Sequence, residues 1–166
     1  MKMIAVADRA GGIGCDGSLL IDLPTDMKYF RKTTAGATVI MGRKTLESFP
    51  GGKPLPKRRN IVLSRTLKED DADGYEICRS PEQAAELVKD EDQEHVFVVG
   101  GGEVYNLMLP YVDEALITEI ETTIEKADTF IPVFSKEPDW ELVSRSEPVH
   151  ENGVTYTFAV YRRKDR

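Results

Sequence analysis

Val98-Val99-Gly100-Gly101-Gly102-Glu103-Val104-Tyr105 is the stretch that most constrains the fold. It begins in an apolar run over residues 95–99 and passes through three glycines into a helix-like segment over residues 102–109. An apolar run of this length predicts a buried strand. Glycines let a backbone approach a ligand closely, and the start of a helix presents N–H groups to an anion. The alternative interpretation is a tight strand-to-helix turn without a ligand.

Apolar runs and helix-like segments alternate along the rest of the chain. The further runs that predict strands lie at residues 3–7, 38–41, 60–64 and 115–120. Helix-like segments lie at residues 25–34 and 44–48 and from Pro81 onward, with Ser80 as N-cap and Gln83 closing a capping box. Glu151-Asn152-Gly153 is a hairpin signal between residues 141–146 and 155–162. We therefore expect one α/β domain over residues 1–166, with a mainly parallel central sheet, a C-terminal antiparallel hairpin and flanking helices.

The composition excludes several classes of protein. The chain has 166 residues with 22 Lys and Arg against 29 Asp and Glu, a net charge of −7, which argues against broad nucleic-acid binding. No apolar run approaches the roughly 20 residues of a membrane span. Cys15 and Cys78 predict two free thiols rather than a disulfide, and His95 and His150 are too few for a multi-histidine metal site. We expect a cytoplasmic protein without a metal.

A second glycine-rich segment, Gly12-Ile13-Gly14-Cys15-Asp16-Gly17, formally matches the dinucleotide fingerprint G-x-G-x-x-G. That fingerprint requires a strand directly before it and a helix directly after it. Here four residues follow the strand, and Pro24 intervenes before the next helix. We therefore expect a mobile loop over residues 10–21, beside a site.

Two basic clusters occur at predicted strand ends. Gly42-Arg43-Lys44-Thr45 resembles the end of a P-loop, but its spacing and its arginine do not support ATP chemistry. Ser64-Arg65-Thr66 follows another strand. Cations and hydroxyls gathered in this way in an acidic protein indicate a ligand with several phosphates. Solvated surface charge is the alternative for either cluster alone.

Asp26 is the candidate acid. Pro24 suits a helix start, so Asp26 falls in the first turn, beside the helical side that carries Met27 and Phe30. A carboxyl group at the border of an apolar pocket has a raised pKa, and it can bind an amidine-like edge or assist proton transfer. The alternative is a first-turn acid that interacts only with the helix dipole.

Taken together, these segments resemble dihydrofolate reductases, in order and over nearly the whole chain. The matching segments are Ile13-Gly14, Leu23-Pro24-Thr25-Asp26, residues 39–48, Pro54-Leu55-Pro56, residues 58–64 and residues 99–105. The resemblance implies NADPH-dependent reduction of 7,8-dihydrofolate to 5,6,7,8-tetrahydrofolate, with hydride transfer to C6 and protonation at N5, in one-carbon metabolism. It also implies antifolate inhibitors as ligands. No apolar stripe demands a protein partner, so we expect a monomer.

The resemblance also implies roles for individual residues. Asp26 would hold the 2-amino group and N3 of the pterin and favour protonation at N5, with Thr118 hydrogen-bonded to that network. Arg58 would pair with the carboxylate of the glutamate tail. The other implied substrate contacts are Ile4, Val6, Met27, Phe30, Phe49, Leu55 and Val99. The implied cofactor contacts are Val6, Ile13, Gly42, Arg43, Lys44, Thr45, Leu63, Ser64, Arg65, Arg79, Val99, Gly101, Gly102, Glu103, Val104 and Tyr105, with a cis bond between Gly100 and Gly101.

One catalytic position departs from the family pattern. Leu20-Ile21 stands where the family usually has Pro-Trp, and Ile21 cannot donate the hydrogen bond of an indole N–H. This departure favours an alternative, a binding module of the same fold without efficient catalysis. A second alternative is a reductase of a ribosylated pyrimidine in riboflavin synthesis, which would not be expected to keep both Leu-Pro-x-Asp and Arg58. In the family, residues 10–21 would form a lid over the nicotinamide.

Overall fold

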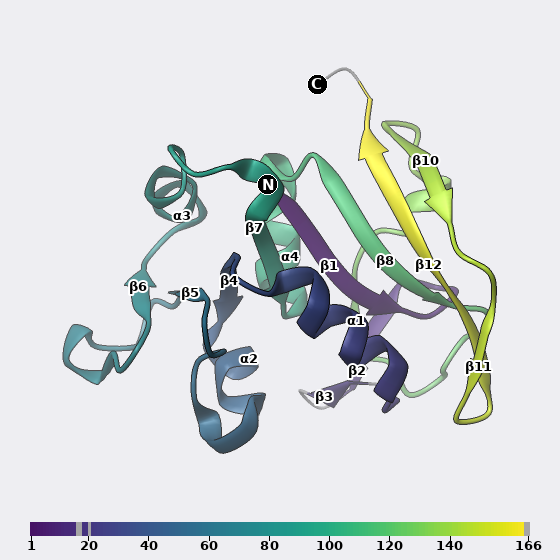
Figure 1. Cartoon of the computed structure of the whole chain (residues 1–166), viewed down its shortest axis with the longest axis horizontal. Coiled ribbons are helices and arrows are strands. Elements are labelled where there is room, and N and C mark those ends of the chain that lie inside the picture. Colours follow the sequence, from purple (N-terminus) through teal and green to yellow (C-terminus); the bar gives the residue numbers. More distant parts are fainter. Residues whose placement is uncertain (16–17, 20, 165–166) are drawn as a thin grey trace.

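Figure 1 shows a computed structural model that describes residues 1–15, 18–19 and 21–164, with the backbone alone for residues 15, 18 and 19. Nine strands of the described chain form the central sheet. They are β1 (Lys2–Ala7), β4 (Thr38–Gly42), β5 (Arg59–Leu63), β6 (Glu76–Cys78), β7 (Val96–Gly100), β8 (Glu114–Ile120), β10 (Trp140–Arg145), β11 (Val149–Glu151) and β12 (Val154–Arg163). Their order is β10-β12-β8-β1-β7-β4-β5-β6, with β11 beside β12.

The centre of this sheet is parallel and its C-terminal side is antiparallel. Strand β1 pairs in parallel with both β7 and β8, and β4 pairs in parallel with β5 and β7. Strand β12 runs antiparallel to β8, β10 and β11. The predicted fold class is therefore confirmed. The two segments predicted on either side of the turn do pair antiparallel, as β10 and β12, but the turn at Asn152 and Gly153 connects β12 directly to the short β11.

Helices cover both faces of the sheet. They are α1 (Pro24–Thr34), α2 (Arg43–Ser48), α3 (Pro81–Leu87) and α4 (Gly102–Met108). Residues of α1 and α2 pack in one hydrophobic cluster, and residues of α3 and α4 pack in the cluster on the other face, as the layers in Figure 1 show. Short 3-10 turns occur at η1 (Pro50–Gly52), η2 (Glu69–Asp71), η3 (Gln93–His95), η4 (Leu109–Tyr111) and η5 (Phe134–Lys136).

The start of α3 confirms one predicted cap and corrects another. The Gln83 N–H donates to Ser80 Oγ at 3.1 Å, so Ser80 is the N-cap. The side chain of Gln83 does not close the predicted capping box onto Ser80. It accepts from the N–H of Arg79 at 2.7 Å instead, because the chain before the helix places that donor within reach.

The glycine-rich segment predicted as a loop is largely a small sheet. Strands β2 (Gly12–Cys15), β3 (Ser18–Leu19) and β9 (Thr129–Phe130) pair in the order β3-β2-β9. The prediction missed β2 because glycines carry no alternating apolar pattern. Residues 16, 17 and 20 of the predicted mobile lid lie outside the described residues, as does the side chain of Cys15.

Two further features of the described chain bear on its composition: the thiol of Cys78 and the length of the helices. Cys78 is a buried free cysteine, and burial raises the pKa of its thiol to about 11. Among the described residues, no helix has the length and apolar character that crossing a membrane requires.

Candidate functional site

The acid of the site is Asp26, in the first turn of α1. Its side chain is only 6% exposed, and the hydroxyl of Thr118 on β8 donates to its Oδ1 at 2.6 Å. Burial raises the pKa of Asp26 to about 6; the hydrogen bond from Thr118 opposes this rise, and the negative charge of Glu151 adds to it. Asp26 is therefore an acid that exchanges its proton near neutral pH.

The start of α1 is fixed by a contact that the sequence does not signal. Glu151, at the end of β11, accepts from the Thr25 N–H at 3.1 Å and from the Thr25 hydroxyl at 2.6 Å. These residues are 126 positions apart, so no local pattern relates them. Pro24 opens the helix without an N–H that needs a partner. Together these features place Asp26 over the sheet.

Most of the predicted apolar wall lies in one cluster. Ile4 of β1 and Val99 of β7 are buried there, and the half-buried side chains packed against them include Phe30, Phe49 and Leu55. Val6, another predicted wall residue, packs in a separate cluster with Leu23, Ile120 and Tyr156, and the predicted catalytic position Ile21 lies in that cluster too. Met27 is 36% exposed. The wall is thus built from β1, α1, β7 and the segment after α2.

Arg58 is fixed beside the C-terminal half of α1. Its Nε donates to the carbonyl and hydroxyl oxygens of Thr34 at 3.0 and 3.1 Å, and Nη2 donates to the carbonyl of Arg31 at 3.0 Å. Nη1 donates to the carbonyl of Pro56 at 2.8 Å. Partial burial lowers the pKa of this guanidinium from its ordinary high value. The charge is held in place by backbone oxygens before any ligand arrives.

The glycine turn between β7 and α4 is as close-packed as the sequence implied. The Gly100–Gly101 peptide is cis, as the resemblance predicted. A Cβ on Gly102 would lie 2.2 Å from Thr129 Cγ2, and a Cβ on Gly42 would lie 3.0 Å from Val104 Cγ2. A Cβ on Gly101 would face Thr45 Oγ1 at 3.6 Å. The turn therefore brings the Thr45 hydroxyl close to a backbone without side chains.

Tyr105 of α4 connects this turn to the apolar wall. Its hydroxyl donates to the carbonyl of Ile4 at 2.6 Å, and burial raises the pKa of the phenol. Sequence reasoning did not anticipate this bond, which uses one of the two lone pairs on the Ile4 oxygen.

The predicted cations of the cofactor side are exposed and loosely paired. Arg43 lies 3.6 Å from Glu47, and Arg65 lies 3.8 Å from Glu103. Arg65 and Glu103 are 84% and 76% exposed. Lys44 is exposed as well, next to Thr45 at the start of α2. Exposed cations and a hydroxyl beside a glycine turn fit a ligand with several phosphates.

Two other predicted cofactor residues, Arg79 and Ser64, have hydrogen-bond partners within the protein. Arg79 donates to the carbonyls of Ser64, at 3.0 Å, and Leu67. Ser64 Oγ accepts from the N–H groups of Thr66 and Leu67. Leu63, Ile13 and Val104 are buried in the core. Arg79 therefore braces the loop after β5.

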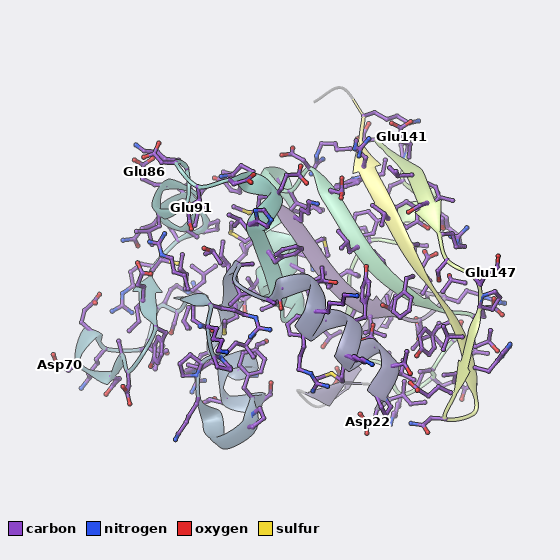
Figure 2. All side chains as sticks on the ribbon, viewed as in Figure 1. Asp22, Asp70, Glu86, Glu91, Glu141 and Glu147 are labelled. Atoms are coloured by element: carbon purple, nitrogen blue, oxygen red, sulfur yellow. The ribbon has the colours of Figure 1, made fainter. Side chains whose placement is uncertain are left out.

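Several acidic side chains lie at the periphery of the molecule. Figure 2 shows Asp70, Glu86, Glu141 and Glu147 pointing outward at the edges of the molecule. The net charge of −7 is therefore compatible with local positive potential at α2 and β5.

Comparisons with known proteins agree over the length of the chain. The family model described as dihydrofolate reductase matches residues 1–163. The chain is 44% identical over 130 residues to the dihydrofolate reductase of Haemophilus influenzae, covering 78% of this chain and 76% of that protein. It is 36% identical over 165 residues to the enzyme of Staphylococcus haemolyticus, covering 98% and 95%. It is also 36% identical over 176 residues to the enzyme of Bacillus subtilis, covering 99% and 95%.

Proposed function

The chain belongs to the dihydrofolate reductase family, and we propose which of its residues carry the NADPH-dependent reduction of dihydrofolate to tetrahydrofolate. The observation on which the assignment rests is the buried pair of Asp26 and Thr118. NADPH, when bound, supplies the hydride that reduces C6 of the pterin. The protein must hold the pterin edge and provide a proton for N5.

Asp26 performs the proton chemistry. Thr118 fixes Oδ1, which leaves Oδ2 to meet the 2-amino group and N3 of the pterin. With a pKa of about 6, the carboxyl group carries a proton in part of the molecules near neutral pH. It favours protonation at N5 from this position. Ile21 lacks a donor, so the proton supply depends on Asp26 alone among these residues.

The apolar wall and Arg58 bind the rest of the substrate. Ile4, Val6, Met27, Phe30, Phe49, Leu55 and Val99 contact the pterin and the aromatic part of dihydrofolate. Arg58 pairs with a carboxylate of the glutamate tail through its braced guanidinium. A fixed fork binds a planar carboxylate without first losing side-chain freedom.

The cofactor side fits NADPH in its donor chemistry. Arg43, Lys44, Thr45, Ser64 and Arg65 hold its phosphates, with Arg43 and Arg65 on the 2′-phosphate. Gly101 and Gly102 meet the pyrophosphate, and Ile13 and Tyr105 line the nicotinamide site. The remaining assigned contacts are Val6, Gly42, Leu63, Arg79, Val99, Glu103 and Val104. The bare backbone of the glycine turn beside Thr45 supports this assignment.

We also propose one domain over residues 1–166 that acts as a monomer in the cytoplasm. A continuous sheet covered by helices on both faces supports the single domain. The large apolar side chains exposed in the described structure are scattered over α1, α4, β9 and β10, which supports the monomer. The free thiol of Cys78 supports a reducing compartment. Gel filtration with light scattering tests the monomer.

The assay that tests the function follows NADPH absorbance in the presence of dihydrofolate. We expect turnover with NADPH, weaker turnover with NADH, and loss of most turnover at neutral pH in Asp26→Asn, with partial recovery at low pH as the substrate protonates itself. Asp22→Asn is the matched control, because Asp22 is an exposed acid just before α1. Binding of both ligands without turnover in the wild type would favour the binding module. Full neutral-pH turnover in Asp26→Asn would refute the role of Asp26.

A further inference from the structure

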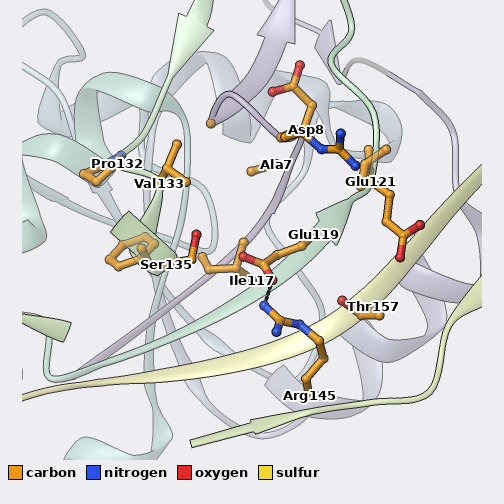
Figure 3. Close-up of a pocket in the computed structure, with 14 residues that line it drawn as sticks. Ala7, Asp8, Ile117, Glu119, Glu121, Pro132, Val133, Ser135, Arg145 and Thr157 are labelled. Atoms are coloured by element: carbon orange, nitrogen blue, oxygen red, sulfur yellow. Dashed lines mark hydrogen bonds and ion pairs between the residues drawn. The ribbon is translucent and has the colours of Figure 1, made fainter. Parts of the chain in front are cut away.

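A pocket lies on the face of the sheet opposite α1, where β1 and β8 end (Figure 3). It is bordered by Asp8, Glu119 and Arg145, with Phe134 and Val133 on the side of the 132–135 segment. Arg145 pairs with Glu119 across it, and every buried side-chain polar atom of the described residues has a hydrogen-bond partner. The carboxylates of Asp8 and Glu119 and the guanidinium of Arg145 are thus engaged within the protein.

The carboxylate of Asp8 ties two distant segments together. Its side chain is 5% exposed, and no cation among the described residues forms an ion pair with it. Oδ1 accepts from the N–H groups of Ala10 and Gly12 at 2.9 and 2.8 Å, within its own turn. Oδ2 accepts from the N–H of Ile124 at 2.8 Å, in the connection between β8 and β9. Burying a carboxylate costs free energy, and here only hydrogen bonds from backbone N–H groups offset that cost. Moving the carboxylate away from these donors would leave a buried charge without partners, so its position is closely fixed.

The packing around Gly12 depends on that carboxylate. A Cβ on Gly12 would lie 2.9 Å from Asp8 Oδ2 and 2.7 Å from the Cβ of Ala127. Gly12 is also paired with Phe130 in the register of β2 and β9. Asp8 and Ala127, which lies two residues before β9, therefore fill the space beside Gly12 and leave no room for a side chain on β2 at this position.

Strand β2 and strand β9 in turn contact the glycine turn of the cofactor side. At Gly102 a Cβ would lie 2.2 Å from Thr129 Cγ2 and 3.6 Å from Ile13 Cδ1. Ile13 follows Gly12 directly in β2, and Thr129 pairs with Gly14. A displacement of β2 against β9 would consequently alter the wall of the glycine turn. Asp26, Thr118 and Arg58 are not part of this contact, because they belong to α1, β8 and the segment before β5.

We propose that Asp8 is a positioning residue for the cofactor, acting through Gly12, Ile13 and Thr129 on the backbone at Gly102. The inference rests on the proposed function, since it takes the glycine turn as the place where NADPH binds. Asp8 touches neither ligand, and its effect is selective for NADPH over dihydrofolate.

The test is calorimetric titration of the ligand-free protein with NADPH and, separately, with dihydrofolate. Asp8→Asn keeps the shape, but one carbonyl oxygen cannot serve both segments, so the amide must face a backbone N–H on one side. We expect the dissociation constant of NADPH to rise about tenfold, as the loss of one buried hydrogen bond implies, and that of dihydrofolate to change less than about twofold. The matched control is Asp92→Asn, because Asp92 also accepts a backbone N–H, that of Glu94, at the exposed turn η3.

Each outcome decides between the proposals. Equal weakening of both ligands would show that Asp8 is merely structural, and unchanged NADPH affinity would remove its role. Failure of the wild type to bind NADPH would instead refute the proposed cofactor side. If Asp8→Asn does not fold, Gly12→Ala presses on the same carboxylate from β2, and it is expected to show the same selectivity for NADPH.

Discussion

The substrate side and the cofactor side of the site hold their charges in opposite ways. On the substrate side, Asp26 is buried against Thr118 and Arg58 is fixed by backbone carbonyls. On the cofactor side, Arg65 is 84% exposed, and its distance to Glu103 is 3.8 Å. The charges of the proposed substrate side are held by the protein itself, and those of the proposed cofactor side are exposed and loosely paired.

This difference predicts that mutations on the two sides differ in the size and in the salt dependence of their effects. A preorganised and desolvated group loses little freedom on binding, and its interactions are not weakened by solvent. Each exposed charge that lies several ångströms from its partner contributes little binding free energy, and salt screens that contribution. We therefore expect single changes on the substrate side to have large, salt-insensitive effects, and changes on the cofactor side to have small, salt-sensitive ones.

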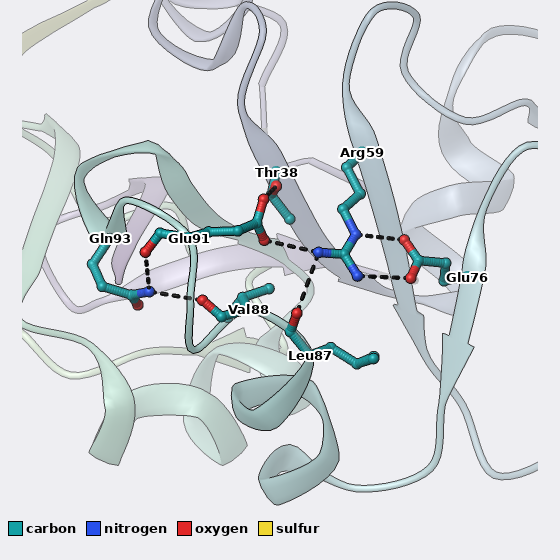
Figure 4. A network of polar contacts seen from close by, with 7 residues as sticks. All are labelled: Thr38, Arg59, Glu76, Leu87, Val88, Glu91 and Gln93. Atoms are coloured by element: carbon teal, nitrogen blue, oxygen red, sulfur yellow. Dashed lines mark hydrogen bonds and ion pairs between the residues drawn. The ribbon is translucent and has the colours of Figure 1, made fainter.

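Arg58→Lys tests the preorganised side most directly. An ammonium group cannot reproduce the braced fork, so the KM for dihydrofolate should rise about 10- to 100-fold while NADPH affinity is unchanged. Steady-state kinetics at two salt concentrations measure this. The matched control is Arg59→Lys, whose guanidinium binds Glu76 and Glu91 away from the site (Figure 4). An equal rise of KM in both variants would show that the effect is structural.

Asp26→Asn should stabilise the folded protein at neutral pH. The pKa of Asp26 is raised from 3.8 to about 6 on folding, so the native state binds the proton more tightly. The free energy of unfolding therefore falls as pH rises through this interval, and it remains lowered above it. Removing the charge should restore on the order of 1–3 kcal/mol at pH 7. Urea unfolding of both proteins at pH 7 and near pH 4 measures this; an advantage that persists undiminished at the lower pH contradicts the assigned ionisation.

Arg65→Gln tests the exposed side. The dissociation constant of NADPH should rise about two- to fivefold at low salt, and the rise should shrink as salt is added. NADH binding should be unaffected, because it lacks the 2′-phosphate. Lys89→Gln is the control, since Lys89 is an exposed cation that is paired with Glu86 and follows α3. Titrations that show the same loss for NADH would remove Arg65 from the 2′-phosphate.

Glu103→Gln should have the smallest effect. Glu103 competes for Arg65, so removing its charge should tighten NADPH binding about twofold at low salt. The gain should vanish in a variant that also carries Arg65→Gln. Weaker NADPH binding in Glu103→Gln would mean that Glu103 contacts the cofactor favourably.

The sequence predicts those elements that local features mark, such as apolar runs and helix caps. The buried strands β1, β4, β5, β7 and β8 are short apolar runs, and Ser80 and Pro81 mark the start of α3. The small sheet of β2, β3 and β9 escapes prediction because glycines pack there through contacts with residues more than 100 positions away.

The site divides in the same way. Asp26 and the two basic clusters are visible as residue types beside strands and helix starts. The resemblance implied roles for Thr118 and Arg58. The hydrogen bonds that fix Arg58, and those from Thr25 to Glu151, depend on tertiary contacts. In the sequence, Asp8 is only the polar residue that follows the apolar run over residues 3–7, and the three backbone N–H groups that donate to it are brought together by the fold.

The pairing of β1 has a consequence for how this chain is made. Its parallel neighbours are β7 and β8, so this strand has no parallel partner in the sheet until residues 96–120 have been synthesised. Its apolar side chains lack that cover until then, and closing the sheet demands contacts of long sequence separation. Shortened nascent chains that end before β8 should depend on a chaperone to remain in solution.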